Sequence, residues 1–593
     1  MNLATHPVER VPLRHWAAVL GSMLGAFMAV LDIQITNASL KDILGSLGAT
    51  LEEGSWVTTS YLVAEIVVIP LTGWLATVFS PRRYLIGTTA AFLVASMACA
   101  WAWNLESLIT FRVIQGFTGG AMIPMALALV LQLLPARHHP LGFAIFGMTA
   151  TFAPAIGPSI GGWLTNNYGW PWIFYMNLVP GSLMLAALTW GMARAPMQLR
   201  KFRHGDWAGV VTVATGLGCL ITLLEEGNQN DWFNSGEMVA LAVVAGVMLV
   251  AGTVIEFRVR EPFINLRLLA RLDFGMACGI GTVFGLGMYG VMYVLPVYLA
   301  QIQGFNAGQI GRTIMWGGVP QLFMMPVAAA LTKRYDARWL MTVGLSAFAA
   351  SCLLNGQLTH LTGHDQLRLT QFIRALGMPL VLVPLTTVAT RGLPQVHTGS
   401  ASALFNMLRN LGGSIGIALL ATRISVGEKV HSVRIGEAVS LYDHETVTRL
   451  ESLAGYFGSH GADPHTAARL SLHALDLTVR REAFVAAFGD AFTLLGVILL
   501  ATIPLVWLIR ANRPLQGGWA SSPTTGAASS APAGPTSPAF CGPAASNRIP
   551  GPPNTMTSIS CSDIPRTELM ARTRKDAVLC RRATGGGRPR LSF

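Results

Sequence analysis

Long apolar stretches separated by short polar segments account for most of this chain. An apolar helix of about 20 residues, rising about 1.5 Å per residue, is long enough to cross the hydrocarbon core of a bilayer. The pattern predicts membrane-spanning helices at fourteen places: 16–36, 55–77, 84–103, 107–132, 142–164, 173–193, 207–225, 237–256, 274–300, 313–331, 339–358, 370–390, 402–424 and 484–509. Because the number of spans is even, both ends of the chain are expected on the same side of the membrane.

The composition agrees with this pattern. Charged residues make up 12% of the 593 residues and hydrophobic residues 52%, whereas soluble domains contain about 25% charged residues. The net charge of +12 does not indicate a nucleic-acid partner, because the basic residues lie in the short gaps between apolar stretches. We therefore predict an all-α protein whose main partner is the lipid bilayer.

The charges in the gaps predict the orientation. Alternate gaps contain most of the basic residues, namely Arg10, Arg14, Arg82, Arg83, Arg137, Arg194, Arg200, Lys201, Arg203, Arg258, Arg260, Arg267, Arg271, Lys333, Arg334, Arg338 and Arg391. The remaining short gaps are mainly acidic, with Asp42, Glu52, Glu53, Glu106, Glu225, Glu226, Asp231 and Glu237, and their basic residues are Lys41, Arg312 and Arg368. Since cytoplasmic loops are enriched in Lys and Arg, both termini are predicted to be cytoplasmic.

The two halves of the chain are similar to each other. Residues 331–338, which follow span ten, resemble residues 75–83, which follow span two, and 372–377 resembles 111–116. Two parallel halves are suited to alternating access by rocking. We predict a cytoplasmic N-terminus (1–15), an N-terminal six-helix bundle (16–193), a linker with two additional central helices (194–273), a C-terminal six-helix bundle (274–510) and a cytoplasmic tail (511–593).

Two segments differ from the short gaps. Residues 425–483 form a long, polar loop of mixed charge, which the charge pattern places outside and in which 465–481 is expected to form a short helix. Residues 514–593 are rich in Pro, Ala, Ser, Gly and Thr, a composition typical of disordered segments. We assign this tail no function.

Three charged residues within the spans are candidates for proton coupling. Asp32 in span one and Arg112 in span four lie at matching depth, and a lone charge there costs about 2.5–3.5 kcal/mol. Each therefore requires a partner, and protonation of Asp32 would break such a pair. The alternative is a static structural ion pair. Glu65, near the midplane in span two, could carry a proton or attract a cationic substrate, or it could be a protonated side chain bonded to a neighbouring helix.

Other residues are candidates for binding a substrate. Arg374 and Arg409 could pair with carbonyl groups or bind anions in the C-terminal bundle, although simple snorkelling is equally compatible with their positions. A substrate cavity could be lined by generic apolar and aromatic side chains. The candidates in the C-terminal half are Met288, Tyr289, Tyr293 and Phe323.

The fifth span contains the spacing Gly-Pro-x-x-Gly-Gly at Gly157, Pro158, Gly161 and Gly162. Small residues let membrane helices approach closely, so we expect these four residues to form a packing surface between the bundles. Ordinary helix packing is the alternative. The spacing resembles the antiporter motif in the fifth span of major facilitator exporters.

Over residues 14–510 the chain resembles the fourteen-span drug:proton antiporter family of the major facilitator superfamily, the EmrB/QacA type. The matching stretches are Leu31–Asn37, Gly73–Arg83, Arg112–Gly120, Gly157–Leu164, Trp170–Asn177, Pro384–Thr387 and Arg409–Gly416. In the gating loop after span two, Gly73, Arg82 and Arg83 match the family. Thr77 and Ser80 instead replace its usual acidic residue and glycine, and Pro171 replaces an arginine.

The resemblance implies a proton-coupled exporter of amphipathic toxic compounds in the bacterial inner membrane. It implies the proton gradient as the energy source and no cofactor. EmrB-like members work with a periplasmic adaptor of the EmrA type and an outer-membrane channel, and residues 425–483 could contact such an adaptor.

Two alternatives remain open on the sequence alone. The same scaffold could carry a specific metabolite, siderophore or fatty acid in a proton-linked manner. A membrane-embedded sensor or enzyme is disfavoured, because the sequence contains no soluble catalytic domain and its tail lacks foldable hydrophobic periodicity. The chain lacks a Gly-Lys dipeptide and hence a P-loop, which argues against ATP-driven transport, and its seven cysteines form no metal-ligand pattern. We predict no catalytic and no metal-binding residues.

Overall fold

The computed structural model describes residues 11–203, 205–259, 262–391 and 398–510. Within these residues all regular secondary structure is helical, and fourteen helical segments are long and apolar enough to cross a membrane, which confirms the predicted number. Residues 1–10 of the predicted N-terminal segment, Arg260 and the predicted tail 511–593 lie outside the described residues.

The first six spans form the N-terminal bundle. Its helices are α1 (Leu13–Ala38), α2 (Leu40–Leu47), α3 (Leu51–Phe79), α4 (Pro81–Ala100), α5 (Leu105–Gly119), α6 (Met122–Leu133), α7 (His139–Tyr168), α8 (Trp172–Tyr175) and α9 (Leu178–Gly191), with the short η1 (Ala136–His138) before α7. The fourth span is divided into α5 and α6 near Gly120, and the sixth into α8 and α9 near Asn177. The second division places a polar side chain inside the bundle.

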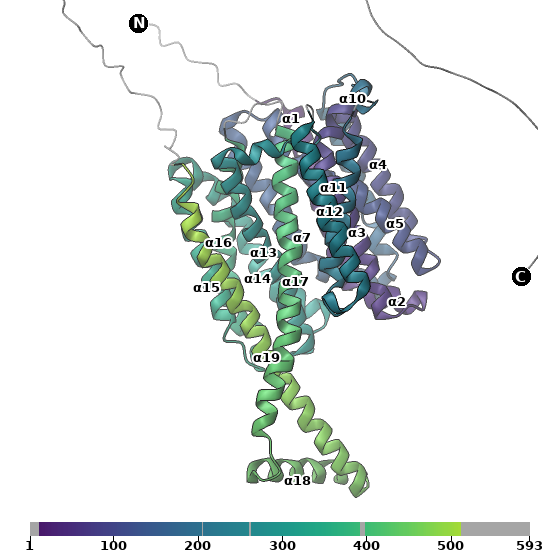
Figure 1. Cartoon of the computed structure of the whole chain (residues 1–593), viewed down its shortest axis with the longest axis vertical. Coiled ribbons are helices and arrows are strands. Elements are labelled where there is room, and N and C mark those ends of the chain that lie inside the picture. Colours follow the sequence, from purple (N-terminus) through teal and green to yellow (C-terminus); the bar gives the residue numbers. More distant parts are fainter. Residues whose placement is uncertain (1–10, 204, 260–261, 392–397, 511–593) are drawn as a thin grey trace, which may run out of the picture. The chain divides into compact units, whose positions relative to one another are not determined.

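The two additional helices follow α10 (Leu199–Arg203) and form a hairpin of α11 (Trp207–Glu226) and α12 (Gly236–Arg258), with η2 (Trp232–Asn234) between them. Figure 1 shows the two helices side by side, and α11 packs against α3. At the end that carries Glu226 and Trp232 the hairpin contacts both bundles. Glu226 accepts hydrogen bonds from Ser55 at 3.2 Å and Thr59 at 2.8 Å, and Trp232 Nε1 donates to Thr422 at 3.0 Å.

Glu225 and Glu226, assigned from the sequence to the gap after span seven, are the last two residues of that span. Helix α11 extends through both residues and buries Glu226 against α3. The hydroxyl donors on α3 make this burial favourable, because a buried carboxylate needs hydrogen-bond partners.

The C-terminal bundle begins after η3 (Leu266–Ala270). Its helices are α13 (Leu272–Gln301), α14 (Ala307–Arg334), α15 (Ala337–Asn355), α16 (His364–Thr390), α17 (Thr398–Ala438) and α19 (Pro464–Val506). Helix α17 packs against α13 and α19, and it also contacts α3 and α6 of the first bundle. It is therefore one of the helices through which the two bundles touch.

The segment 425–483 is a helical hairpin instead of the expected loop with one short helix. Helices α17 and α19 contain 41 and 43 residues, or about 60 Å each, twice the hydrocarbon thickness. Figure 1 shows both continuing past their neighbours and joined by α18 (His444–Ser459). Side-chain caps stabilise this hairpin. Hydrogen bonds from Thr446 hold the pKa of Asp443 below its usual range.

At the opposite end of the membrane helices the bundles are in direct contact. Ser402 Oγ donates to the carbonyl of Pro124 at 2.7 Å. A Cβ added to Gly73 would lie 3.0 Å from the backbone nitrogen of Ser400, so α3 and α17 approach closely only because residue 73 is glycine. This contact closes the protein on the side away from α2 and α18.

Candidate transport site

A buried ion pair lies within the N-terminal bundle. Asp32 of α1 is 2% exposed and Arg112 of α5 is 0% exposed, and Nη1 of Arg112 pairs with Oδ2 of Asp32. The guanidinium also donates from Nε to the carbonyl of Val57 at 3.1 Å and lies 4.3 Å from the ring centre of Tyr61. The structure thus brings together the two residues that the sequence matched by depth and charge.

Two amides complete the surroundings of the carboxylate. Asp32 Oδ1 accepts from Gln115 Nε2 at 3.0 Å and from Asn177 Nδ2 at 2.7 Å. The same two amides donate to Ser96 Oγ, and Gln115 Oε1 accepts from Arg112 Nη1 at 2.9 Å. The network therefore joins α1, α4, α5 and the break between α8 and α9.

The expected site residues did not include these amides, although the sequence contains two signals for them. Gln115 follows Arg112 by three residues, which places both on one face of α5. Asn177 ends the stretch Trp170–Asn177 that matches the family. A buried amide three residues from a buried arginine is a candidate partner for the same carboxylate.

A cavity of about 390 Å³ lies between the two bundles. Residues of α1, α2, α3, α11, α13 and α17 line it, among them Glu65, Tyr289 and Tyr293. Glu225 and Glu226 contribute two further carboxyl groups from α11, and within the described residues the lining contains no Lys, Arg or His. No group of three or more His, Cys, Asp or Glu side chains there could hold a metal ion.

Glu65 links the two bundles across this cavity. Its side chain is 4% exposed; Oε1 accepts from Asn410 Nδ2 of α17 at 3.5 Å, and Oε2 has no hydrogen-bond partner. Asn410 Oδ1 in turn accepts from Tyr289 at 3.3 Å and from Arg409 Nη2 at 3.5 Å. Arg409 is buried, with its guanidinium 5.7 Å from the ring centre of Phe146 on α7.

Asp32 does not line this cavity. Its neighbours Val30, Ile33 and Gln34 on α1 do so, while Asp32 faces the interior of the N-terminal bundle. The two acids proposed for proton coupling thus occupy different environments. Glu65 lies in the cavity wall and Asp32 lies behind that wall.

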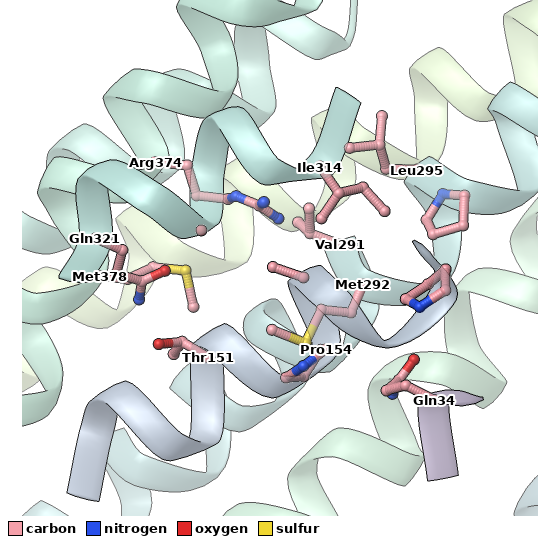
Figure 2. A pocket seen from close by; sticks show the side chains of 14 residues that line it. Gln34, Thr151, Pro154, Val291, Met292, Leu295, Ile314, Gln321, Arg374 and Met378 are labelled. Atoms are coloured by element: carbon pink, nitrogen blue, oxygen red, sulfur yellow. The ribbon is translucent and has the colours of Figure 1, made fainter. Parts of the chain in front are cut away.

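Arg374 lies in a second, much smaller cavity of about 30 Å³ between α7, α13, α14 and α16, about the volume of one water molecule. Figure 2 shows its guanidinium directed into this space, with Thr151 and Pro154 of α7 on the opposite side. The residue is 6% exposed, which excludes snorkelling. A Cβ on Gly317 would lie 2.6 Å from Arg374 Nη2, so the glycine on α14 leaves room for the guanidinium group in this position.

The glycines of the fifth-span motif pack within one bundle. A Cβ on Gly157 would meet the side chain of Gln34, and one on Gly161 would lie 3.0 Å from the carbonyl of Ile35. Both neighbours belong to α1. The expectation that these two glycines lie between the bundles is therefore wrong.

Other residues of α7 face the C-terminal bundle. Pro158 lines the small cavity beside Arg374, and Gly162 is half-buried. A Cβ on Gly147 would lie 2.8 Å from Met325, which shows that α7 and α14 are in close contact there.

Two residues expected in a substrate cavity lie elsewhere. Phe323 is 74% exposed on the outer face of α14, and Met288 is buried in the core of the C-terminal bundle. Neither lines the two cavities. All faces of a membrane helix are apolar, so the sequence pattern cannot distinguish a lipid-facing position from a cavity-facing one.

The gating-loop residues lie at the closed end. Arg82 Nη2 donates to the carbonyl of Thr189 on α9 at 2.8 Å, and Arg83 is exposed. Ser80, which replaces the usual glycine, has φ of 68°. The loop therefore retains a left-handed conformation that a glycine would adopt without strain.

Comparison with characterised proteins identifies similar chains. The colistin resistance protein EmrB of Acinetobacter baumannii is 32% identical over 506 residues, covering 85% of this chain and 98% of the relative. The multidrug export protein EmrB of Escherichia coli is 31% identical over 484 residues, covering 81% and 94%. The fatty acid resistance protein FarB of Neisseria gonorrhoeae is 30% identical over 499 residues, covering 84% and 96%.

Solved structures share the fold at low sequence identity. The human organic anion transporter MFSD10 gives a TM-score of 0.53 at 14% identity, covering 83% of this chain and 99% of that one. The proton:xylose symporter XylE gives 0.53 at 12% identity, covering 85% and 97%. Residues 22–417 match the Major Facilitator Superfamily. With its fourteen spans arranged as two six-helix bundles and an additional pair, this chain belongs to the Major Facilitator Superfamily as an EmrB-like, multi-pass membrane transporter.

Proposed function

We propose that this protein exports amphipathic toxic compounds across the bacterial inner membrane in exchange for protons. The observation that carries the proposal is Glu65, a buried carboxyl group with one unpartnered oxygen in the wall of the cavity between the bundles. Because Asn410 connects it to the other bundle, a change in its charge acts where the bundles meet. Relatives named for colistin resistance and multidrug export support the substrate class.

Asp32 and Arg112 form the proposed coupling pair. Protonation of Asp32 removes the charge that holds Arg112, while arginine keeps its own charge. The guanidinium then favours a different arrangement of α1 and α5, and the equilibrium between conformations shifts. Gln115 and Asn177 hold the carboxylate in place for this exchange and transmit its movement to α4 and α9.

The cavity is the proposed binding site for the exported compound. Tyr289 and Tyr293 provide aromatic surface, which suits many amphipathic molecules. Glu65 acts either as a second proton carrier or as a counter-charge for a cationic compound. Arg374 and Arg409 lie outside this cavity wall, so we assign them to positioning within the C-terminal bundle.

The proposed alternating access rests on a difference between the two ends of the protein, one reached by the cavity and the other closed. The cavity reaches the helix ends near Asn37 and Gln229, whereas Gly73 and Ser402 make contacts that close the other end. Exchange requires the contacts around Gly73 to open, with Arg82 and Arg83 nearby as gating residues.

The orientation and the partners are part of this proposal. With both termini cytoplasmic, the hairpin of α17, α18 and α19 projects into the periplasm, where its exposed residues Leu441, Tyr442 and Tyr456 could contact an adaptor of the EmrA type that leads to an outer-membrane channel. We expect transport and no enzymatic reaction, since the relatives are transporters.

A second candidate substrate class is favoured by one relative. FarB is named for fatty acid resistance, so the same site could export a fatty acid or a related metabolite. Both candidates predict export with proton entry, and the panel of substrates that triggers proton movement distinguishes them.

Purified protein in vesicles with an imposed proton gradient provides the test. Asp32→Asn is expected to abolish uphill transport of a cationic amphiphile but to retain exchange of substrate without a gradient, because only the coupling is lost. Asp476→Asn, on the exposed part of α19, is the matched control and should transport normally. Gradient-driven transport by a folded Asp32→Asn protein would remove Asp32 from the mechanism.

A further inference from the structure

A groove lies on the exposed face of α14, apart from both cavities. Its volume is about 370 Å³, and it is lined by Arg312, Met315, Trp316, Val319, Pro320 and His364. Trp316 and Val319 are exposed, and Phe323 follows one turn further along the same face. In a protein that spans a membrane, this apolar strip faces the lipid.

Basic groups gather at one end of the groove. Arg312 is exposed and has no ion-pair partner among the described residues. The guanidinium of Arg368 lies 5.2 Å from the ring centre of Trp316 and pairs with Asp365 at 2.7 Å. His364, the first residue of α16, lies with Nδ1 3.1 Å from the hydroxyl of Thr313. The two arginines and Asp365 together carry a net charge of +1.

These arginines are exceptions to the charge pattern of the chain. Arg312 and Arg368 are two of the three basic residues in the short gaps assigned to the outside. Arg312 lines the groove, and Arg368 lies beside it over the ring of Trp316. Orientation does not require them there, because basic residues are selected on the cytoplasmic side. Guanidinium groups are well suited to binding a phosphate group.

The length of the strip matches one leaflet. From Arg312 to Phe323 the helix rises about 16 Å, which is about half of a hydrocarbon core of about 30 Å. A molecule with a phosphate at Arg312 and an acyl chain along Trp316, Val319 and Phe323 would therefore fit the groove in the normal orientation of a membrane lipid.

We infer that this groove binds one anionic phospholipid of the outer leaflet, with its phosphate held by Arg312 and Arg368 and one acyl chain on the strip formed by Trp316, Val319 and Phe323. The inference uses the proposed orientation of the chain but not the proposed transport reaction. It gives Phe323, which lies outside both cavities, a contact with lipid.

Competition between two lipids with identical acyl chains tests this site. The purified full-length protein is equilibrated in mixed micelles containing phosphatidylglycerol and phosphatidylcholine, and the retained lipids are counted by native mass spectrometry. The unaltered protein should retain one phosphatidylglycerol preferentially. A basic residue near the membrane surface attracts an anionic lipid strongly enough that its loss should weaken retention about five-fold. We therefore expect this decrease for each of Arg312→Gln and Arg368→Gln, and a decrease of about twenty-five-fold for the double variant.

Arg480→Gln is the matched control, because Arg480 lies on the exposed part of α19 and also pairs with an acid. It should retain the lipid fully. Phe323→Ala should weaken retention of both lipids alike, since it alters only the surface for the chain. Equal retention of the two lipids by the unaltered protein, or unchanged retention by the Arg312 and Arg368 double variant, would overturn the inference. Lipid retention is measured without transport, so a failure of the transport proposal leaves this result unaffected.

Discussion

Buried charged and polar side chains have more of their hydrogen-bonding atoms paired around Asp32 in the N-terminal bundle than around Arg409 in the C-terminal bundle. In the N-terminal bundle both oxygens of Asp32 are paired, and Arg112 is paired through Nε and Nη1. In the C-terminal bundle Nε and Nη1 of Arg409 have no partner, and neither amide atom of Gln371 has one. The Asp32 network in the first bundle is closed except at Arg112 Nη2, which has no partner, whereas four buried atoms of Arg409 and Gln371 in the second bundle have none.

This difference separates two tasks that a transporter must perform. A closed network stabilises one arrangement strongly and changes only when a proton removes one of its charges. Groups with unused capacity, such as Arg409 and Gln371 outside the cavity wall, can change partners at lower cost when the bundles move. Within the proposed function, this difference supports proton coupling mainly in the N-terminal bundle and rearrangement of polar contacts in the C-terminal bundle.

The largest expected effect tests the closed network. Asp32→Asn should lower the stability of the protein by about 3–5 kcal/mol, because Arg112 remains charged and buried without its partner. Arg112→Gln should cost less, since Asp32 can bind a proton and become neutral. Thermal unfolding of the purified variants in one detergent measures both. If Arg112→Gln lowers the stability more than Asp32→Asn does, the unpaired charge of Arg112 is not the main cost of breaking the pair.

The next effect tests whether the hairpin of α11 and α12 is attached more strongly to the N-terminal bundle than to the C-terminal bundle. Glu226→Ala should cost about 1–3 kcal/mol, because it removes the acceptor for the Ser55 and Thr59 hydroxyl groups. Trp232→Phe removes one hydrogen bond to Thr422 and should cost about 1 kcal/mol. Glu226→Gln retains an acceptor and serves as the control. Equal costs for the two bundles would contradict the stronger attachment to the N-terminal one.

A smaller effect is expected at Arg409 in the C-terminal bundle. Arg409→Gln should change the stability by no more than about 1 kcal/mol, since two of its nitrogen atoms already lack partners. Thermal unfolding in parallel with Asp32→Asn gives the direct contrast. A loss as large as that of Asp32→Asn would remove the distinction between the bundles.

An effect of about the same size is expected in the corresponding loops of the two halves. Ser80 in the first half has φ of 68°, whereas Asp336 in the second has an ordinary φ of −63°. Ser80→Gly should therefore stabilise the protein by about 1 kcal/mol. Replacement of Asp336 by Gly should destabilise it, because the cap on Arg338 is lost. Melting temperatures that move in the same direction would contradict this reading.

Much of the fold could be predicted from the sequence because the bilayer imposes strict rules. Each span needs a long apolar stretch, so the fourteen helices could be counted. The cost of a charge in lipid likewise indicated that Asp32 and Arg112 require partners, and the structure places them in contact.

The remaining features depend on tertiary contacts that a one-dimensional pattern does not contain. Asn177 reaches Asp32 only because a helix breaks beside it. Glu226 belongs to α11 because α3 supplies hydroxyl donors, although the polar residues after it suggested an outside gap. Phe323 faces outward because of the rotation of α14, which an apolar sequence leaves undetermined.

Helix α17 has a mechanical consequence outside the membrane. It runs without interruption from Thr398, past Asn410 in the cavity wall, to Ala438 at the far end of the hairpin. The 28 residues beyond Asn410 make a rod of about 42 Å, so a tilt of about 10° at the cavity moves its tip by about 7 Å. A partner protein bound at that tip would therefore be displaced whenever α17 tilts at the cavity.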